Sequence, residues 1–411
     1  MPDAAPPTAG HDAAPLAPAL GDRGLFPTLE LVAYLNHAAI SPFSKPVADA
    51  VRQVAEDYSR QGLHALFPWL DKREQLRAQL ATLIGAREPT SVGLTTNTSH
   101  GVTSVALCFP WRAGDRVVLF TGEFPANVTP WQRAAELFQL ELEFLPLRPY
   151  LAADGQGLQQ LEDALRRRPA RLVAVSAVQF QTGLRMPLSA MARICHARGA
   201  ELFVDAIQGC GVVPFDVEAD AIDYFTAGGH KWLMGPEGTG FLYVRPERAR
   251  ALVPRTASWI SHEEPFQFLF EGSGHLRYDR AFKRDARLVE GAAGNTIGLA
   301  GLGAAVDLLL ALGVDAIFEH TQGYLDALER ALLDRGFTSA RADRPAARSA
   351  ILSVSPPAPH TAVSLQQRLV AAGISCTTPD GFLRFAPHWP NDAARELPRV
   401  LAALDEALAS P

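Results

Sequence analysis

Between residues 116 and 206 the chain alternates short apolar, β-branched runs with amphipathic segments, and this pattern restricts the fold more than any other feature. The runs are RVVLF (116–120), ELEFLPL (141–147), RLVAVSAV (171–178) and ELFVDA (201–206). Helical periodicity falls between them, near 130–140, 158–168 and 187–199. Strands joined by crossover helices lie parallel, so the alternation predicts a mostly parallel sheet in an α/β fold.

The flanking segments extend this architecture. Two helices are expected before the first strand, over 44–62 and 70–85. Two further strands, 221–229 and 238–246, follow the alternating region with only a short connection, so we expect at least one edge of the sheet to run antiparallel. Past Thr296 the pattern changes to that of a second, α+β domain, with helices near 299–313 and 315–335, a strand at 350–355, a helix at 364–372, a strand at 382–386 and a final helix.

Composition excludes several classes of protein. The chain has 411 residues, 48% of them apolar, which is enough for one large and one small folded domain. With 38 basic and 44 acidic residues the net charge is −6, and without a Lys/Arg run we expect no nucleic-acid partner. The apolar stretch 298–314 contains Asp307 and is too short to predict a membrane span, and no signal peptide precedes it. We expect no membrane partner.

Four cysteines lie far apart in the sequence, at positions 108, 195, 210 and 376. No CxxC pair or histidine stands at zinc-ligand spacing, so we predict neither a disulfide framework nor a metal site. A cytoplasmic location fits this cysteine usage best.

Polar residues that follow strands carry the functional prediction, because ligands of open α/β sheets bind at the carboxyl ends of the strands. Asp205 ends the strand 201–204, and Gln208 lies three residues further on. The strand 221–226 leads into Gly228-Gly229-His230-Lys231-Trp232. A lysine at this edge is a candidate imine-forming amine, although a single lysine in a loop is more often solvated.

Two further segments lie at the same predicted edge. Thr98 and Ser99 belong to a hydroxyl-rich stretch before an apolar helix, where free N–H groups favour a phosphate, although an ordinary helix cap would look the same. Phe124 and Asn127 follow the strand 116–120 and add an aromatic ring, unless it belongs to the core, and an amide. A carboxylate, an amine, a phosphate cup and an aromatic ring together match the requirements of pyridoxal phosphate.

With these residues in place the sequence resembles the class V aminotransferase family of fold-type-I pyridoxal-phosphate enzymes, which includes cysteine desulfurases, kynureninase and isopenicillin N epimerase-like proteins. The most specific segments are VDAIQ (204–208) and GGHKWLMGPEGTGFLYV (228–244), within a resemblance that runs from Tyr34 to His388. It implies a large domain with a mostly parallel seven-stranded sheet and a smaller α+β C-terminal domain. The expected division is a disordered Ala/Pro-rich tail at 1–22, a segment associated with the small domain at 23–45, the cofactor-binding domain at 46–297 and the small domain at 298–411.

The resemblance also implies a role for each candidate residue. Lys231 is expected to form the Schiff base with the cofactor and to carry the proton at Cα, while Asp205 pairs with the pyridine nitrogen. Arg384 is expected to hold the substrate α-carboxylate. The remaining cofactor contacts would be Gln208 to the phenolic oxygen, Phe124 stacked on the ring, Asn127 near the ring or substrate, and Thr98, Ser99 and His230 on the phosphate. The resemblance further implies a homodimer with active sites near the interface, a role for which the small residues of 291–296 are suited.

Three positions depart from the family pattern. Gly228 stands where members often carry a phosphate-binding Ser, and Ala292-Ala293 stands where they carry a Gly-Thr pair that reaches the partner's phosphate. Cys376 is the cysteine nearest to the sulfur-accepting position of desulfurases, but it lies only eight residues before Arg384. We interpret it as a buried, inert cysteine.

Two other function classes are weaker. A nucleotide-dependent dehydrogenase is not supported, because the only Gly-rich candidate, Gly298-x-x-Gly301-x-Gly303, lies inside a predicted helix and not between a strand and a helix. A catalytically idle, cofactor-binding homologue remains open. Within the enzyme class we expect transamination or Cβ/C–S lyase chemistry on an α-amino acid. An epimerase of the isopenicillin N epimerase type is the alternative, because all these reactions pass through a Cα carbanion.

Overall fold

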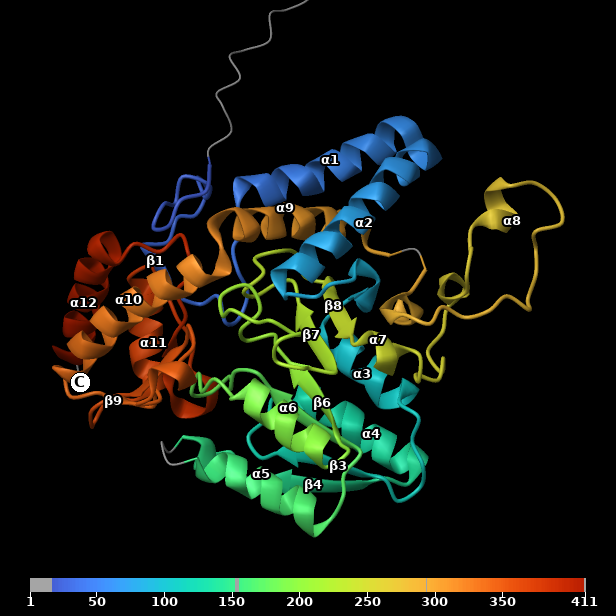
Figure 1. Cartoon of the computed structure of the whole chain (residues 1–411). Helices are drawn as coiled ribbons and strands as arrows, with labels where there is room; N and C mark the ends of the chain where they lie inside the picture. Colours follow the sequence, from blue (N-terminus) through green and yellow to red (C-terminus); the bar gives the residue numbers. More distant parts are fainter. Residues whose placement is uncertain (1–16, 152–154, 293, 410–411) are drawn as a thin grey trace, which may run out of the picture.

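A computed structural model describes residues 17–151, 155–292 and 294–409. Its centre is a seven-stranded sheet in the order β2-β8-β7-β6-β5-β3-β4 (Figure 1). Neighbouring strands are parallel except at β8, which is antiparallel to both β7 and β2. The strands are β2 (Val92–Thr95), β3 (Arg116–Phe120), β4 (Glu141–Leu145), β5 (Leu172–Ser176), β6 (Glu201–Asp205), β7 (Tyr224–Gly228) and β8 (Gly240–Val244).

Alternating side chains of each strand enter two separate cores, one on each face of the sheet, as the two-residue period of a strand requires. On β3, Val117 and Leu119 join one core and Val118 and Phe120 join the other. Helices α3 (Thr98–Cys108) and α4 (Thr129–Phe138) cover the first face. The second face is covered by α2 (Leu66–Leu83), α5 (Gln156–Arg167), α6 (Leu188–Ala197) and α9 (Thr296–Leu312).

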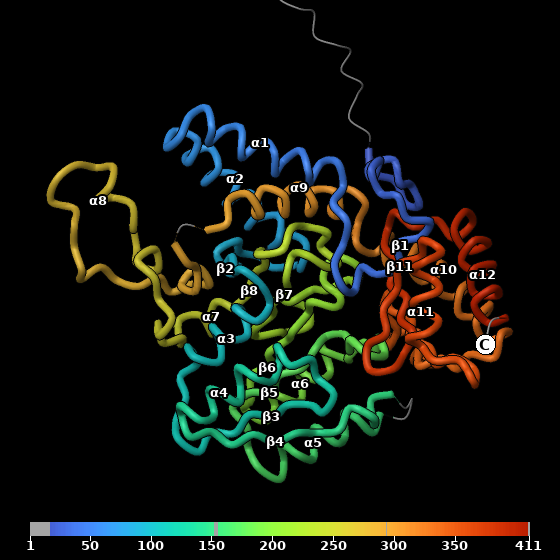
Figure 2. The backbone as a smooth tube through the Cα atoms, turned by 180° about the vertical axis from the view of Figure 1, so that it is seen from behind, coloured from blue at the N-terminus to red at the C-terminus, as the bar shows by residue number. Residues whose placement is uncertain are grey.

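The C-terminal part has a core of its own. Its three-stranded sheet has the order β12-β10-β9, with β9 (Thr338–Ser339), β10 (Leu352–Ser355) and β12 (Leu383–Phe385). Helices α10 (Val314–Leu333), α11 (Ala362–Ala371) and α12 (Ala393–Ala409) pack on it. The N-terminal β1 (Ala33–Tyr34) pairs in parallel with β11 (Ile374–Ser375), so residues near the start of the described chain lie beside the C-terminal sheet (Figure 2).

The remaining helices lie at the edge of the molecule. Helix α1 (Lys45–Gln61) packs along α9, and α7 (Pro246–Ala249) follows β8. Helix α8 (Gln267–Phe270) sits at the tip of residues 262–282, which project from the body as an arm (Figure 1). Short 3-10 helices are η1 (Gly62–Ala65), η2 (Pro89–Ser91), η3 (Pro125–Asn127), η4 (Arg148–Tyr150), η5 (Trp259–Ser261), η6 (Ala286–Val289), η7 (Pro345–Ala347) and η8 (Pro379–Gly381).

The fold class expected from the sequence is confirmed, including the seven strands of the large sheet. The expected antiparallel pairing at one edge is also present, because β8 pairs in antiparallel with β7 and with the edge strand β2, which the sequence pattern did not indicate. The domain boundaries stay predictions, and residues 1–16 of the expected tail lie outside the described residues.

The long apolar stretch after Asn295 forms a buried helix, as expected, and α10 follows it directly. In the part of the chain that the structure describes, no single helix is long and apolar enough to cross a membrane. The consecutive helices α9 and α10 meet that criterion only as a pair, and the pair is bent by 79°.

Candidate active site

The carboxyl ends of β3, β5, β6 and β7 lie at one edge of the sheet because these strands are parallel, and the predicted residues follow them. Lys231 comes three residues after β7, and its amine lies 5.7 Å from the centre of the Phe124 ring. The amine makes no hydrogen bond or ion pair with any residue that the structure describes. Burial lowers the pKa of Lys231 to about 8; Asp205 opposes this shift and Arg384 adds to it. An amine with this pKa is a base or nucleophile near neutral pH.

Asp205 is the last residue of β6, and its side chain is only 2% exposed. One carboxylate oxygen accepts a hydrogen bond from the Ile207 N–H at 3.0 Å, and the other has no partner among the described residues. Burial raises the pKa of Asp205 to about 7, the Ile207 hydrogen bond and Lys231 oppose that rise, and Glu123 adds to it. A buried carboxylate with an unused oxygen requires a cationic or donor partner, which a protonated pyridine nitrogen would provide.

Phe124 follows β3 and leaves 46% of its side chain exposed, so it is not a core residue. The ring of Phe180, which follows β5, packs against its edge with centroids 5.3 Å apart. Phe124 thus packs against another aromatic ring in a T-shaped arrangement, while the Lys231 amine lies over the Phe124 ring. This arrangement fits a residue that stacks on a planar cofactor.

The hydroxyl-rich stretch that the sequence predicts to bind phosphate lies at the N-terminus of α3. The Asn97 side chain caps the helix by accepting a hydrogen bond from the His100 N–H at 2.8 Å, whereas the Thr98 hydroxyl is buried without a partner among the described residues. A Cβ atom placed on Gly228 would lie 3.2 Å from Thr98 Oγ1 and 3.3 Å from His230 Cε1, so these residues converge. An orphaned hydroxyl at a helix N-terminus fits a phosphate. Ser99, the next residue, is exposed at the same end of the helix.

Gln208 and Asn127, which are predicted to contact the cofactor, form hydrogen bonds with protein groups in the structure. The Gln208 amide donates to the Ala38 carbonyl at 3.1 Å and accepts from the Trp232 indole at 3.0 Å. The Asn127 amide donates to Glu123 at 3.3 Å and accepts from the Trp131 indole at 3.2 Å. Each amide therefore keeps one N–H for a cofactor, and the expected contacts of both residues stay predictions.

Arg384 lies on β12 and brings the C-terminal sheet to the same edge. Its guanidinium donates to the Phe180 carbonyl at 2.8 Å and to the Thr377 hydroxyl at 3.3 Å. The side chain is buried, forms no ion pair with a described residue, and burial lowers the pKa of Arg384 to about 10. A buried cation without an anion is costly, and three of its five N–H groups remain for a carboxylate.

Several contacts that hold this site were not predicted. The Ser41 hydroxyl donates to the Lys231 carbonyl at 2.6 Å, and the Ser41 N–H donates to the His230 carbonyl at 2.8 Å. His37 contacts the same hydroxyl through Nδ1 at 2.7 Å. These contacts join two segments separated by about 190 positions in the sequence, so a local pattern could not indicate them. Glu123 and Phe180 were missed for the same reason.

All four cysteines are buried and free. Cys376 follows β11, is 2% exposed, and burial raises its pKa to about 12. A thiol in this state is a poor nucleophile, which agrees with the interpretation of Cys376 as an inert residue.

Comparison with known proteins gives the family. The family model described as "Aminotransferase class-V" matches residues 33–381 of the chain. The chain belongs to the class V aminotransferase family. It is 30% identical over 374 residues to the uncharacterized aminotransferase YcbU of Bacillus subtilis (strain 168), covering 90% of this chain and 93% of that relative. It is 31% identical over 303 residues to a cysteine desulfurase of Enterobacter sp. (strain 638), covering 70% of each.

Solved structures share the fold. The cysteine desulfurase CsdA from Escherichia coli has a TM-score of 0.80 and 24% identity, over 94% of this chain and 97% of its own. A mutant of C-DES with glycine covalently linked to its PLP cofactor has a TM-score of 0.84 and 22% identity, over 93% and 99%. Family membership confirms three expectations from the sequence: the fold class, an enzymatic activity, and pyridoxal phosphate as the cofactor.

Proposed function

We propose that the chain removes the Cα proton of an α-amino acid with Lys231 and pyridoxal phosphate, and then completes C–S β-elimination or amino transfer. The observation that carries this proposal is the half-buried Lys231 amine, which has no partner among the described residues and is close enough to Asp205 and Arg384 for both to shift its pKa. No described residue forms a hydrogen bond or ion pair with that amine. A covalent bond to the cofactor would give it a partner.

When bound, pyridoxal phosphate supplies an aldehyde that an amine can capture and a protonated ring that withdraws electrons from Cα. The protein does the rest. Thr98, Ser99 and His230 would hold the phosphate, Asp205 would keep the ring nitrogen protonated, and Phe124 would cover the ring face. Lys231 would move the proton at Cα, because its low pKa lets the amine accept and return a proton near neutral pH.

Arg384 supports an α-amino acid as the substrate class. The free edge of its guanidinium matches the two oxygens of a carboxylate, and the Phe180 carbonyl fixes its orientation. A screen of amino acids against the reconstituted enzyme would follow the absorption of the bound cofactor and assay the products. Pyruvate with sulfide or persulfide indicates C–S elimination, whereas a substrate-derived 2-oxo acid with the amine form of the cofactor indicates amino transfer. No spectral response to any amino acid would contradict the proposal and favour the idle homologue.

The cysteines bear on the choice of reaction. A desulfurase that carries sulfur on its own thiol needs an accessible, low-pKa cysteine. The four cysteines are buried and free, and burial raises the pKa of Cys195, Cys210 and Cys376. We therefore favour release of the product in solution over transfer of sulfur to the protein. The free thiols also agree with the proposed cytoplasmic location.

Arg384→Ala should weaken substrate use while leaving cofactor binding unchanged. Loss of a charge-assisted, two-point contact costs about 2–3 kcal/mol, or about 30- to 150-fold in kcat/KM. Arg384→Lys should recover little of this loss, because an ammonium cannot reproduce the planar fork. Arg166→Ala, on the exposed face of α5, is the control. A kcat/KM of Arg384→Ala within about threefold of the wild type would place the carboxylate clamp elsewhere.

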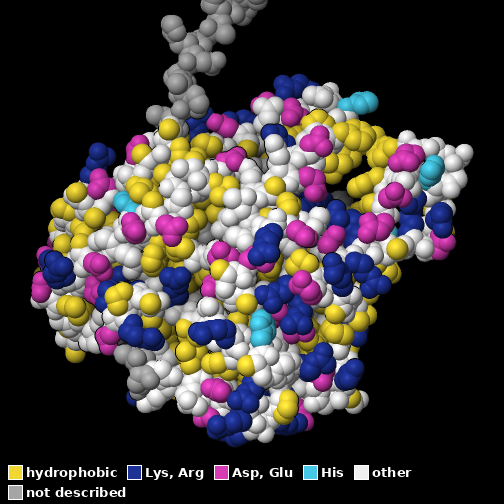
Figure 3. Space-filling view, viewed as in Figure 1, with side chains coloured by type: hydrophobic (Ala, Val, Ile, Leu, Met, Phe, Trp, Pro, Cys, Tyr) yellow, Lys and Arg dark blue, Asp and Glu magenta, His cyan; other side chains and the backbone are white. Residues whose placement is uncertain are grey.

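A homodimer is also part of the proposal. The arm leaves Leu269, Phe270 and Leu276 exposed, and a groove of about 610 Å³ lies between it and helices α1, α2 and α9. Figure 3 shows hydrophobic surface on both sides of this hollow. An apolar arm and an apolar groove on one chain suit a second copy of that chain, which would cover both.

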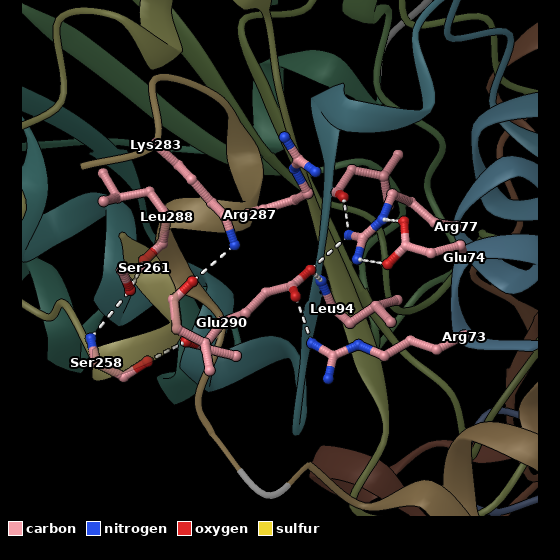
Figure 4. Close-up of polar contacts among 12 residues, drawn as sticks. Arg73, Glu74, Arg77, Leu94, Ser258, Ser261, Lys283, Arg287, Leu288 and Glu290 are labelled. Carbon is pink, nitrogen blue, oxygen red and sulfur yellow. Dashed lines mark hydrogen bonds and ion pairs between the residues drawn. The ribbon is translucent and has the colours of Figure 1, made fainter. Parts of the chain in front are cut away.

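The segment after η6 is the one expected to lie near the partner's phosphate. Its first residue, Glu290, is held in place by several hydrogen bonds. Glu290 accepts hydrogen bonds from Arg77 at 2.5 Å and from the Leu94 N–H at 2.9 Å, and it also pairs with Arg73 (Figure 4). The side chain thus ties this segment to α2 and β2. Ala293, where the family pattern has a phosphate-binding residue, lies outside the described residues.

Charge placed on the arm should separate the subunits. Leu269→Asp combined with Phe270→Asp should convert a dimer to a monomer in light scattering and reduce activity, because the double change puts two carboxylates into an apolar contact. Leu137→Asp, at an exposed apolar position on α4, is the control and should stay dimeric. A wild-type protein that is monomeric and fully active would reject the dimer.

A further inference from the structure

Glu123 is a second buried carboxylate at the edge of the sheet, and the reaction scheme gives it no role. It lies between β3 and Phe124 and is 8% exposed. Burial raises the pKa of Glu123, and hydrogen bonds from Ser176, Asn127 and Gln179 oppose that rise. It forms no ion pair with a described residue.

Four donors surround this carboxylate. One oxygen accepts from the Ser176 N–H at 2.8 Å and from the Gln179 amide at 3.2 Å. The other accepts from the Ser176 hydroxyl and from the Asn127 amide at 3.3 Å. Both oxygens are therefore used twice, which is the full acceptor capacity of an ionised carboxylate.

These contacts join the two sides of the candidate cofactor site. Glu123 immediately precedes Phe124, so its anchoring fixes the start of the loop that carries the ring. Ser176 is the last residue of β5 and stands opposite Asp205 in the register of β5 and β6. The Ala177 N–H then donates to the Asp205 carbonyl at 2.8 Å. Glu123 thus connects the aromatic side of the site to the strand end that carries the carboxylate.

The orientation of one donor is itself fixed. The Trp131 indole donates to Asn127 Oδ1 at 3.2 Å, so the Asn127 amide must present its N–H to Glu123. A glutamine at 123 would place an NH₂ group against Ser176 and Gln179 or against Ser176 and Asn127. In either orientation the NH₂ group faces at least one fixed N–H donor. The isosteric change therefore breaks part of the hydrogen-bond set around residue 123.

We propose that Glu123 is a positioning residue that holds the Phe124 ring at a set distance from Asp205, and thereby prepares the slot for the cofactor ring. This inference rests on the proposed function, because it assumes that the cofactor occupies the space between these two residues. Glu123 itself contacts neither cofactor nor substrate.

A double-mutant cycle on cofactor affinity tests the proposal. The dissociation constant of pyridoxal phosphate would be measured by titration of the apo-proteins for the wild type, Glu123→Gln, Phe124→Ala and the double variant. Glu123→Gln should weaken binding by about 10- to 100-fold in the wild-type background. In the Phe124→Ala background it should change binding by less than about threefold, because the ring that it positions is absent.

Visible circular dichroism of the bound cofactor is the second measurement. Glu123→Gln should reduce its intensity, because the band reports the fixed orientation of the ring, whereas Glu136→Gln on the surface of α4 should not. An equal loss of affinity with and without Phe124 would overturn the proposal, since it indicates a general effect on folding or on the charge of Asp205. If the wild type does not bind the cofactor at all, the proposed function fails, and the inference about Glu123 fails with it. An equal loss in both backgrounds overturns the inference alone.

Discussion

Lys231→Ala should abolish turnover, with a loss of about 10⁴-fold or more, the upper range for a single acid–base group. The lysine has two tasks in the proposed reaction, cofactor attachment and proton transfer at Cα, and no other amine among the described residues lies at this edge of the sheet. The fold should survive, because the Lys231 amine makes no hydrogen bond or ion pair with a described residue. Steady-state assays with the best amino acid, together with the unfolding temperature, measure both effects.

A second substitution at the same position separates the role of the nucleophilic amine from that of its positive charge. Lys231→Arg keeps a cation beside Asp205 but removes the nucleophilic amine, so it should be as inactive as Lys231→Ala. Lys45→Ala, at an exposed position on α1, should retain full activity. Activity of Lys231→Ala within about tenfold of the wild type would be incompatible with the proposed acid–base role.

Asp205→Asn should retain part of the cofactor affinity and lose about 10²- to 10⁴-fold in kcat. The carboxylate would stabilise the ring cation, and breaking a buried ion pair costs about 3–5 kcal/mol. The asparagine oxygen can still accept the hydrogen bond from the Ile207 N–H, so the local backbone should stay in place. A fully active variant would mean that another group protonates the ring.

Asp205→Asn reduces activity, but it should stabilise the cofactor-free protein relative to the wild type as pH rises. Because burial raises the pKa of Asp205 to about 7, the folded chain holds a proton there that the unfolded chain releases near pH 4. The contribution of Asp205 to the free energy of unfolding therefore falls as pH rises from about 4 to about 7. Asp205→Asn lacks this group, so its unfolding temperature relative to the wild type should rise across that window and level off above it. A constant difference would contradict the raised pKa.

The sequence predicted the elements whose signals are local. Alternating apolar runs located β3 and β6 to within a residue, because each parallel strand is buried on both faces and is flanked by helices. Chain order alone placed Asp205 and Lys231 at one edge, since both follow strands of the same sheet. The arrangement of the amine near Phe124 agrees with that expectation.

The sequence did not predict the contacts between distant segments. Strand β2 has only four residues, one of them Gly93, and gives almost no pattern. Ser41 and Glu123 act through hydrogen bonds to residues far along the chain, and such pairs have no period or spacing. The burial of Arg384 was also missed, because it depends on the Phe180 carbonyl, which follows β5 of the seven-stranded sheet.

Borohydride reduction of the cofactor-loaded enzyme, followed by peptide mapping, tests the central claim most directly. The purified protein should be yellow, and reduction should fix pyridoxal phosphate irreversibly to a single peptide that contains Lys231. The Lys231→Ala variant should carry no label after the same treatment. A label on another lysine, or a wild-type protein that takes up no cofactor, would contradict the assignment of this site.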